Sequence, residues 1–110
     1  MQESLEVPAG ESLEAALERL AVPAGRFTVA SGTLERAVLG HQDLDSETYR
    51  TVTLGPATVD SIEGEFHHGD DGDLHLRAAA VVIDEDGATH SGRLVEAKSA
   101  GDLALVVTAD

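Results

Sequence analysis

The sequence predicts an α+β protein, built from a mainly antiparallel β-sheet and one helix near the N-terminus. From Arg26 onward, apolar and polar residues alternate in short runs at roughly ten-residue intervals, separated by Gly-bearing turns, as in an antiparallel sheet. Ahead of Arg26, only the segment 11–20 has the residue spacing of an amphipathic helix. We therefore expect a single helix that packs one apolar stripe against the sheet.

The predicted helix has an apolar side and a charged side. Its apolar stripe consists of Leu13, Ala16, Leu17 and Leu20. Glu11 and Glu14 lie in its first turn and Arg19 near its end, where the helix dipole favours those charges. Pro23 and Gly25 end the helix.

Eight strands are expected, one before the helix and the others after it. They cover 5–7, 27–32, 34–39, 47–54, 57–66, 74–83, 90–97 and 103–108. Between the strands at 57–66 and 74–83, the polar segment 67–73 is predicted to be a loop. No internal repeat or linker divides the chain, so we expect one domain over 1–110.

Composition narrows the class of protein. A 42% hydrophobic and 25% charged content is ordinary for a globular domain. The absence of Cys excludes disulfides, thiolate metal ligands and Cys nucleophiles. No apolar run approaches the roughly 20 residues of a membrane span, and the acidic N-terminus does not resemble a signal peptide. We expect a cytoplasmic protein without a membrane partner.

The net charge of −14 argues against direct DNA binding, because 21 acidic residues oppose 7 basic ones. Nucleic-acid binding depends on Lys and Arg side chains that neutralise phosphates, and the chain has a single Lys and no basic tail. The acidity favours solubility and is also typical of salt-adapted proteins.

A polar cluster is predicted on two strands that follow each other. In Asp73-Leu74-His75-Leu76-Arg77, the alternation places His75 and Arg77 on one side of a strand. After an acidic turn that ends at Gly87, Arg93 lies on one side of the next strand. A hairpin would bring His75, Arg77 and Arg93 together, and these three residues are the candidate site.

Five motifs in order resemble the plants-and-prokaryotes conserved (PPC) domain family, often described as DNA-binding. They are Val7-Pro8-Ala9-Gly10-Glu11, Ala30-Ser31-Gly32, His75-Leu76-Arg77, Glu85-Asp86-Gly87 and Ser91-Gly92-Arg93-Leu94. The order and spacing hold over most of the chain. The resemblance implies a PPC-like fold and assembly as a homotrimer.

The resemblance also implies a metal site that this chain lacks. In metal-binding members the two strand motifs supply three histidines, and here Arg77 and Arg93 stand at two of those positions. A guanidinium is always protonated and cannot be a metal ligand. We therefore expect no metal and no bound zinc. Arginine offers a bidentate fork to carboxylate or phosphate, so the three residues are predicted to bind a small anion. The alternative is that Arg77 and Arg93 pair with the protein's own carboxylates.

Other candidate sites are weaker. The segment 67–73 holds His67, His68 and three aspartates, but neighbouring residues of an extended chain point in opposite directions and the spacing of a calcium loop is missing. A solvated turn explains it better. Ser31 lacks the motif of a nucleophilic serine, and no Walker or Rossmann phosphate loop is present. We expect no catalytic residue and no cofactor. An enzyme ranks third among the possible functions, because the chain shows no complete catalytic constellation.

The run 78–83 is apolar at every position, so both faces of its strand should be covered. One helix cannot cover both, so the second cover would come from another sheet or from another subunit. The PPC resemblance implies another subunit, and we therefore expect a homotrimer. The predicted function is a non-enzymatic oligomeric binding module. The alternative is a DNA-associated regulator whose partner makes the DNA contacts.

Overall fold

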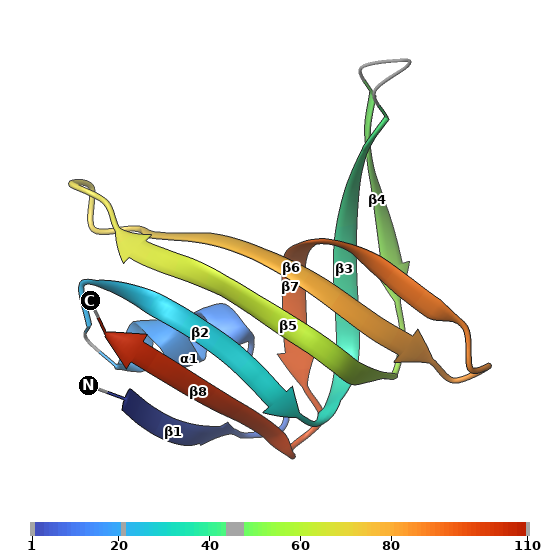
Figure 1. Ribbon diagram of the computed structural model, residues 1–110, viewed down its shortest axis with the longest axis horizontal. Coiled ribbons are helices and arrows are strands. Elements are labelled where there is room, and N and C mark those ends of the chain that lie inside the picture. The colour runs from blue at the N-terminus through green and yellow to red at the C-terminus, as the bar shows by residue number, and fades with distance from the viewer. Residues whose placement is uncertain (1, 21, 44–47, 110) are drawn as a thin grey trace.

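An eight-stranded antiparallel sheet and one short helix account for the part of the chain that the computed structural model describes, residues 2–20, 22–43 and 48–109 (Figure 1). The strands are β1 (Gln2–Val7), β2 (Ala24–Ser31), β3 (Thr33–Asp43), β4 (Thr48–Leu54), β5 (Ala57–His68), β6 (Leu74–Asp84), β7 (Thr89–Ser99) and β8 (Leu103–Ala109). The helix is α1 (Leu13–Arg19). This confirms the predicted mainly antiparallel sheet with one early helix.

The sheet bends back on itself. Its strand order is β1-β8-β2-β5-β6-β7-β3-β4, and β3 also pairs with β5. The strands β5, β6, β7 and β3 therefore form a closed ring, while β1, β8 and β2 extend one side of it. Away from the ring, β3 and β4 continue as a projecting hairpin (Figure 1).

Helix α1 begins at an N-cap serine and buries one stripe. The Ser12 hydroxyl accepts a hydrogen bond from the Ala15 N–H at 3.1 Å, which satisfies one of the free donors of the first turn. Leu13, Ala16 and Leu17 are buried in the core, as predicted, and Leu20 is half-buried. Burying a leucine contributes on the order of 2 kcal/mol, so this stripe holds the short helix on β6 and β7.

Two polar contacts join segments that are distant in sequence. The fully buried Ser99 hydroxyl donates to the Val7 carbonyl at 2.7 Å and accepts from the Gly101 N–H at 2.9 Å. The Asp102 carboxylate accepts from the Thr33 N–H at 2.9 Å and the Thr33 hydroxyl at 2.8 Å, and these hydrogen bonds lower the pKa of Asp102. Gly32, beside Thr33, has a φ of 140°, which only glycine adopts readily.

Several element boundaries differ from the prediction: α1 covers Leu13–Arg19 rather than 11–20, and β3 continues to Asp43 rather than ending at 39. One of the differences affects the site. Strand β5 continues through His67 to His68, so the predicted loop 67–73 begins as strand. The reason is its pairing with β6, which extends to His68↔Leu74 and supplies hydrogen-bond partners that the polar sequence does not reveal. The predicted strand 47–54 matches β4, except that Glu47 lies outside the described residues.

The strand β6 presents one buried face and one open face. Ala78, Ala80 and Val82 point into the core. On the opposite face Ala79 is exposed and Val81 and Ile83 are half-buried, so the single chain covers only one side of the apolar run. Within the described residues, no helix is long and apolar enough to span a membrane.

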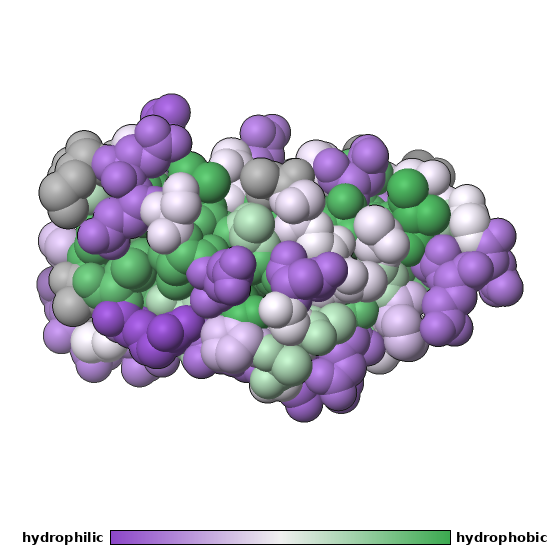
Figure 2. Space-filling view, turned by 90° about the horizontal axis from the view of Figure 1, so that it is seen from below, coloured by the Kyte–Doolittle hydropathy of each residue, from purple (hydrophilic) through white to green (hydrophobic). Residues whose placement is uncertain are grey.

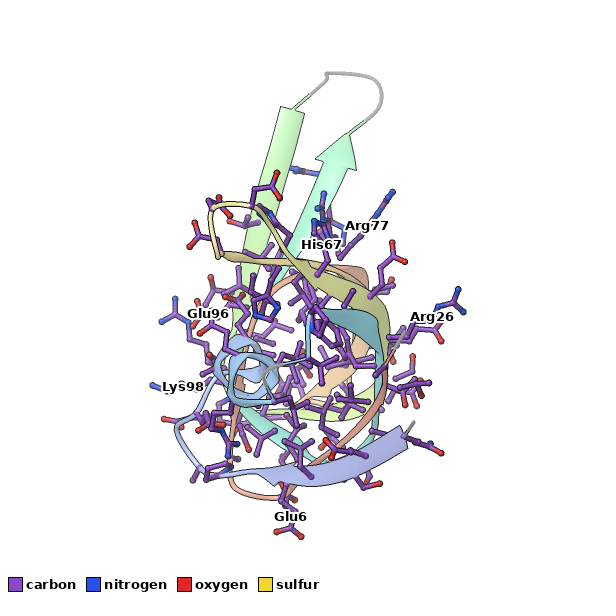
Figure 3. All side chains as sticks on the ribbon, turned by 90° about the vertical axis from the view of Figure 1, so that its left-hand side faces the viewer. Glu6, Arg26, His67, Arg77, Glu96 and Lys98 are labelled. Carbon is purple, nitrogen blue, oxygen red and sulfur yellow. The ribbon has the colours of Figure 1, made fainter. Side chains whose placement is uncertain are left out.

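The side of the molecule on which β1 and β8 lie shows hydrophobic surface between hydrophilic side chains (Figure 2). The charged side chains of the sheet point in different directions. Arg26 and Arg77 extend from one side, whereas Glu96 and Lys98 lie on the side of α1 (Figure 3).

Candidate functional site

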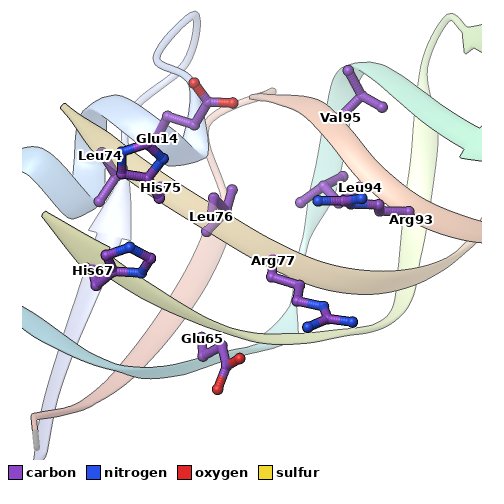
Figure 4. A pocket seen from close by; sticks show the side chains of 10 residues that line it. All are labelled: Glu14, Glu65, His67, Leu74, His75, Leu76, Arg77, Arg93, Leu94 and Val95. Atoms are coloured by element: carbon purple, nitrogen blue, oxygen red, sulfur yellow. The ribbon is translucent and has the colours of Figure 1, made fainter. Parts of the chain in front are cut away.

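A cavity lies in the fork where β6 and β7 separate. The two strands pair from Ile83↔Thr89 to Ala79↔Arg93, and there the pairing ends. Beyond that point β6 continues beside β5, and β7 continues beside β3. The cavity has a volume of about 460 Å³. It is lined by Glu14, Glu65, His67, Leu74, His75, Leu76, Arg77, Arg93, Leu94 and Val95 (Figure 4).

All three residues of the predicted cluster line this cavity. His75 and Arg77 are exposed on the outer face of β6, and Arg93 is exposed on the outer face of β7. Arg93 lies opposite Ala79 in the last pair of the β6–β7 ladder, and Arg77 is the next residue on the same face of β6 beyond it. Figure 4 shows Arg77 extending from β6 and Arg93 from β7 among the side chains that line the cavity.

The two guanidinium groups have no internal ion pair in the part of the chain that the structure describes. Each contact of 4.0 Å or less found there between a basic side chain and a carboxylate involves other residues: Arg19 with Glu11, Arg36 with Glu96, His75 with Asp71 and His90 with Asp84. Glu65 lies directly opposite Arg77 on β5 without forming such a pair. Both guanidinium groups therefore retain donors for a group from outside.

A neighbour of His75 was missed by the sequence analysis. His67 lies directly opposite His75 across β5 and β6, and the two imidazole rings stack with centroids 5.0 Å apart and planes 18° apart. His67 had been assigned to a loop, and only the strand register reveals the pair. His68 is half-buried instead, as the alternation along an extended strand requires.

Asp71 borders the histidine pair from the loop. Its carboxylate accepts a hydrogen bond from the Asp73 N–H at 3.0 Å and lies 3.7 Å from His75 Nε2. The Asp73 hydrogen bond, and secondarily the charge of His75, lower the pKa of Asp71. The loop carboxylate is therefore ionised at neutral pH and places a negative charge beside the histidine pair.

Two further carboxyl groups line the cavity. Glu14 extends toward it from α1, and desolvation followed by the charges of Glu96 and Glu18 raises the pKa of Glu14. Glu65 lies between two arginines in the strand register, Arg26 on β2 and Arg77 on β6. The chain has seven basic residues, and three of them lie on one face of the sheet. They are Arg26 on β2, Arg77 on β6 and Arg93 on β7, and the strands β2, β5, β6 and β7 are consecutive neighbours in the sheet.

The residues around this cavity do not suit a divalent metal. Among residues 2–20, 22–43 and 48–109, no group of three or more His, Asp or Glu side chains is placed to hold a metal ion. Arg77 and Arg93 line the same cavity as His75, and their positive charges repel a metal cation. That zinc is absent from the purified protein remains a prediction.

The family comparison agrees with the sequence motifs. The model of the Plants and Prokaryotes Conserved domain matches residues 4–109. The chain belongs to this family. Among curated proteins, none matches the sequence significantly.

Solved structures share the fold at low sequence identity. A plant- and prokaryote-conserved protein of Pyrococcus horikoshii aligns with a TM-score of 0.82 and 20% identity, covering 100% of this chain and 79% of that one. A protein of Bacteroides thetaiotaomicron named "putative DNA binding protein" aligns with a TM-score of 0.83 and 15% identity, covering 98% and 78%. The metal-containing protein AF0104 of Archaeoglobus fulgidus aligns with a TM-score of 0.79 and 21% identity, covering 100% and 80%. At these identities, the likeness shows the fold.

Proposed function

We propose that this Plants and Prokaryotes Conserved domain is a non-enzymatic binding module that holds a small anion between Arg77 and Arg93, with His75 beside them. The observation that carries the proposal is the pair of guanidinium groups that line one cavity without an internal ion pair among the described residues. Arginine binds carboxylate and phosphate through paired, charge-assisted hydrogen bonds. The proposed ligand is therefore a carboxylate or phosphate group.

Local charge makes this binding feasible in a protein of net charge −14. The potential in a cleft depends mainly on the nearest charges, because salt screens distant surface charges over about 8–10 Å. Arg26, Arg77 and Arg93 are the near positive charges on this face. Glu63 and Glu65 on the same face, and Glu14 in the cavity lining, offset part of them. An anion in the fork would meet Arg77 and Arg93 first.

The proposal includes assembly as a homotrimer in the cytoplasm. Ala79, Val81 and Ile83 form an apolar row on the outer face of β6, which a second copy of the chain would cover. The row runs toward the hairpin end of β6, whereas the cavity lies at the end where β6 and β7 separate. Ala79 lies directly opposite Arg93, so subunit contact centred on Val81 and Ile83 would leave the fork accessible.

A second candidate function is a DNA-associated regulator, which the name of the similar Bacteroides protein supports. In this case the domain would provide oligomerisation and a protein partner would provide the DNA contacts. The net charge of −14 favours the anion-binding module over direct DNA contact by this chain.

Thermal unfolding in the presence of small anions tests the binding module. Inorganic phosphate, pyrophosphate and succinate are titrated against sodium chloride of equal ionic strength, and at least one of the three is expected to raise the Tm saturably. One charged hydrogen bond contributes about 1.5–3 kcal/mol, so Arg77→Ala and Arg93→Ala should each weaken binding by roughly ten- to a hundredfold.

Arg50→Ala is the matched control, because Arg50 is exposed on β4 and does not line the cavity. It removes the same charge and should leave the anion effect intact. If no anion shifts the Tm beyond chloride, or if all three arginine variants lose the effect equally, the proposed site is wrong.

A further inference from the structure

We infer that the anion held by Arg77 and Arg93 is the phosphate of a nucleoside monophosphate, whose base stacks on the paired imidazole rings of His67 and His75. This inference rests on the proposed anion site and adds the class of ligand. It comes from the shape and lining of the fork cavity, which has two chemically different parts.

The first part of the cavity holds two guanidinium groups, with the carboxylate of Glu65 on the neighbouring strand. Arg77 and Arg93 approach it from two strands that have just separated, so their forks can reach one phosphate from different directions. A terminal phosphate presents three oxygen acceptors, which suits two guanidinium groups better than a single carboxylate does.

The second part is planar and apolar. The rings of His67 and His75 lie nearly parallel, 18° apart, and the lining continues into the half-buried Leu74 and Leu76. His75 is 51% exposed, so the ring pair is not closed off by the protein. Bases stack on histidine rings and apolar side chains, so this part suits a heteroaromatic base.

The two parts of the cavity are separated by the two-residue period of a β-strand. His75 and Arg77 are two residues apart on the same face, which corresponds to about 7 Å along the strand. A pentose bridges such a gap between base and phosphate. The Glu14 carboxyl group also lines the cavity and can accept a hydrogen bond from an exocyclic amino group of the base.

Size and charge favour a mononucleotide over a nucleic-acid strand. A volume of about 460 Å³ lies within the roughly 300–1,000 Å³ typical of small-ligand pockets. A longer nucleic-acid strand would bring additional phosphates close to a protein of net charge −14. Within the described part of the chain, the cavity is lined by no arginine other than Arg77 and Arg93 that could bind them.

Isothermal titration calorimetry with adenosine 5′-monophosphate and ribose 5-phosphate tests the inference, because ribose 5-phosphate keeps the sugar and phosphate and carries a hydroxyl group in place of the base. Stacking of one base contributes at least about a fivefold gain in affinity, so the adenosine nucleotide should bind at least that much more tightly. His67→Ala should remove most of this advantage and leave ribose 5-phosphate binding unchanged. His67→Phe, which keeps a stacking ring without a titratable group, should restore it.

His41→Ala is the control, since His41 is exposed on β3 and does not line the cavity. Circular dichroism establishes that each variant is folded. If both probes bind equally and His67→Ala changes neither, the nucleoside part is wrong while the anion site stands. If neither probe binds, the anion site and this inference both fail. Tighter binding of a single-stranded oligodeoxyadenylate than of the mononucleotide would also overturn the inference, in favour of a nucleic-acid strand.

Discussion

At the scale of single residues, Asp84 organises the turn that joins β6 to β7. Its carboxylate accepts hydrogen bonds from the Asp86 and Ala88 N–H groups, both at 2.9 Å, and its other oxygen lies 2.7 Å from His90 Nε2. The hydrogen bond with His90, followed by that from Ala88, lowers the pKa of Asp84 below its ordinary value of 3.8. The turn that defines the hairpin register is therefore stabilised by an ionised side chain.

Asp84→Asn is expected to destabilise the protein in a pH-dependent way. A lowered pKa in the folded state means that ionised Asp84 contributes stability above its unfolded pKa, and this contribution is lost as the pH falls through the folded pKa. The variant should unfold at lower denaturant concentration than the unmodified protein at pH 7, and the difference should shrink toward pH 3.

Asp86→Asn is the matched control, because Asp86 contributes its backbone N–H to this network. It should show little change at either pH. A difference between Asp84→Asn and the unmodified protein that is the same at pH 7 and pH 3 would contradict the role given to the ionised carboxylate.

At the scale of strands, the close approach of β5 to β6 requires a glycine. Gly64 lies opposite Ala78, and a Cβ atom added at Gly64 would meet the Arg77 carbonyl oxygen and lie 2.6 Å from Ala78 Cβ and 2.7 Å from Ala78 Cα. These are mainly backbone contacts, which cannot rotate away. The spacing of β6 beside β5, and with it the position of Arg77, therefore depends on this glycine.

Gly64→Ala should destabilise the protein by about 1–3 kcal/mol, the usual cost of an overpacked interior position. Urea denaturation measures this change. Gly55→Ala serves as control because a Cβ added there meets no atom within 4 Å. Equal stability of the two variants would show that β6 moves away from β5 freely.

Much of the strand arrangement was predictable from the sequence. Alternation and short apolar runs between turns predicted the eight strands, and the Gly-ended acidic segment at 84–87 predicted the β6–β7 hairpin. The strand end at His68 and the pairing of His67 with His75 were not predictable, because both depend on the β5–β6 register rather than on local sequence. Alternation placed His75 and Arg77 on one face, but only the end of pairing at Ala79↔Arg93 creates the cavity beside them.

At the scale of the whole molecule, net charge leads to a prediction about DNA. The isolated chain should show negligible affinity for duplex DNA near physiological salt, because a net charge of −14 opposes the approach of phosphates. Fluorescence anisotropy with a labelled duplex measures this. Submicromolar binding that weakens as salt is added would contradict the prediction and support the DNA-associated function.

The open apolar row on β6 leads to a prediction about assembly. Light scattering should give the mass of a trimer at micromolar concentration, and Val81→Glu should dissociate or unfold it, because an unpaired charge is costly to bury. Val52→Glu is the control, since Val52 is another apolar residue, 39% exposed on β4. A monomeric mass for the unmodified protein would show that Ala79, Val81 and Ile83 remain open to solvent.

The central claim is that Arg77 and Arg93 together bind an anion, and arginine side-chain NMR tests it most directly. The chain has six arginines, and each Nε–Hε group gives a signal that single Arg→Lys variants assign. On titration with adenosine 5′-monophosphate, the signals of Arg77 and Arg93 should shift along one common saturable curve, while those of Arg19, Arg36 and Arg50 should stay nearly constant. Shifts that are absent, or that grow linearly and alike at all six arginines, would contradict the claim.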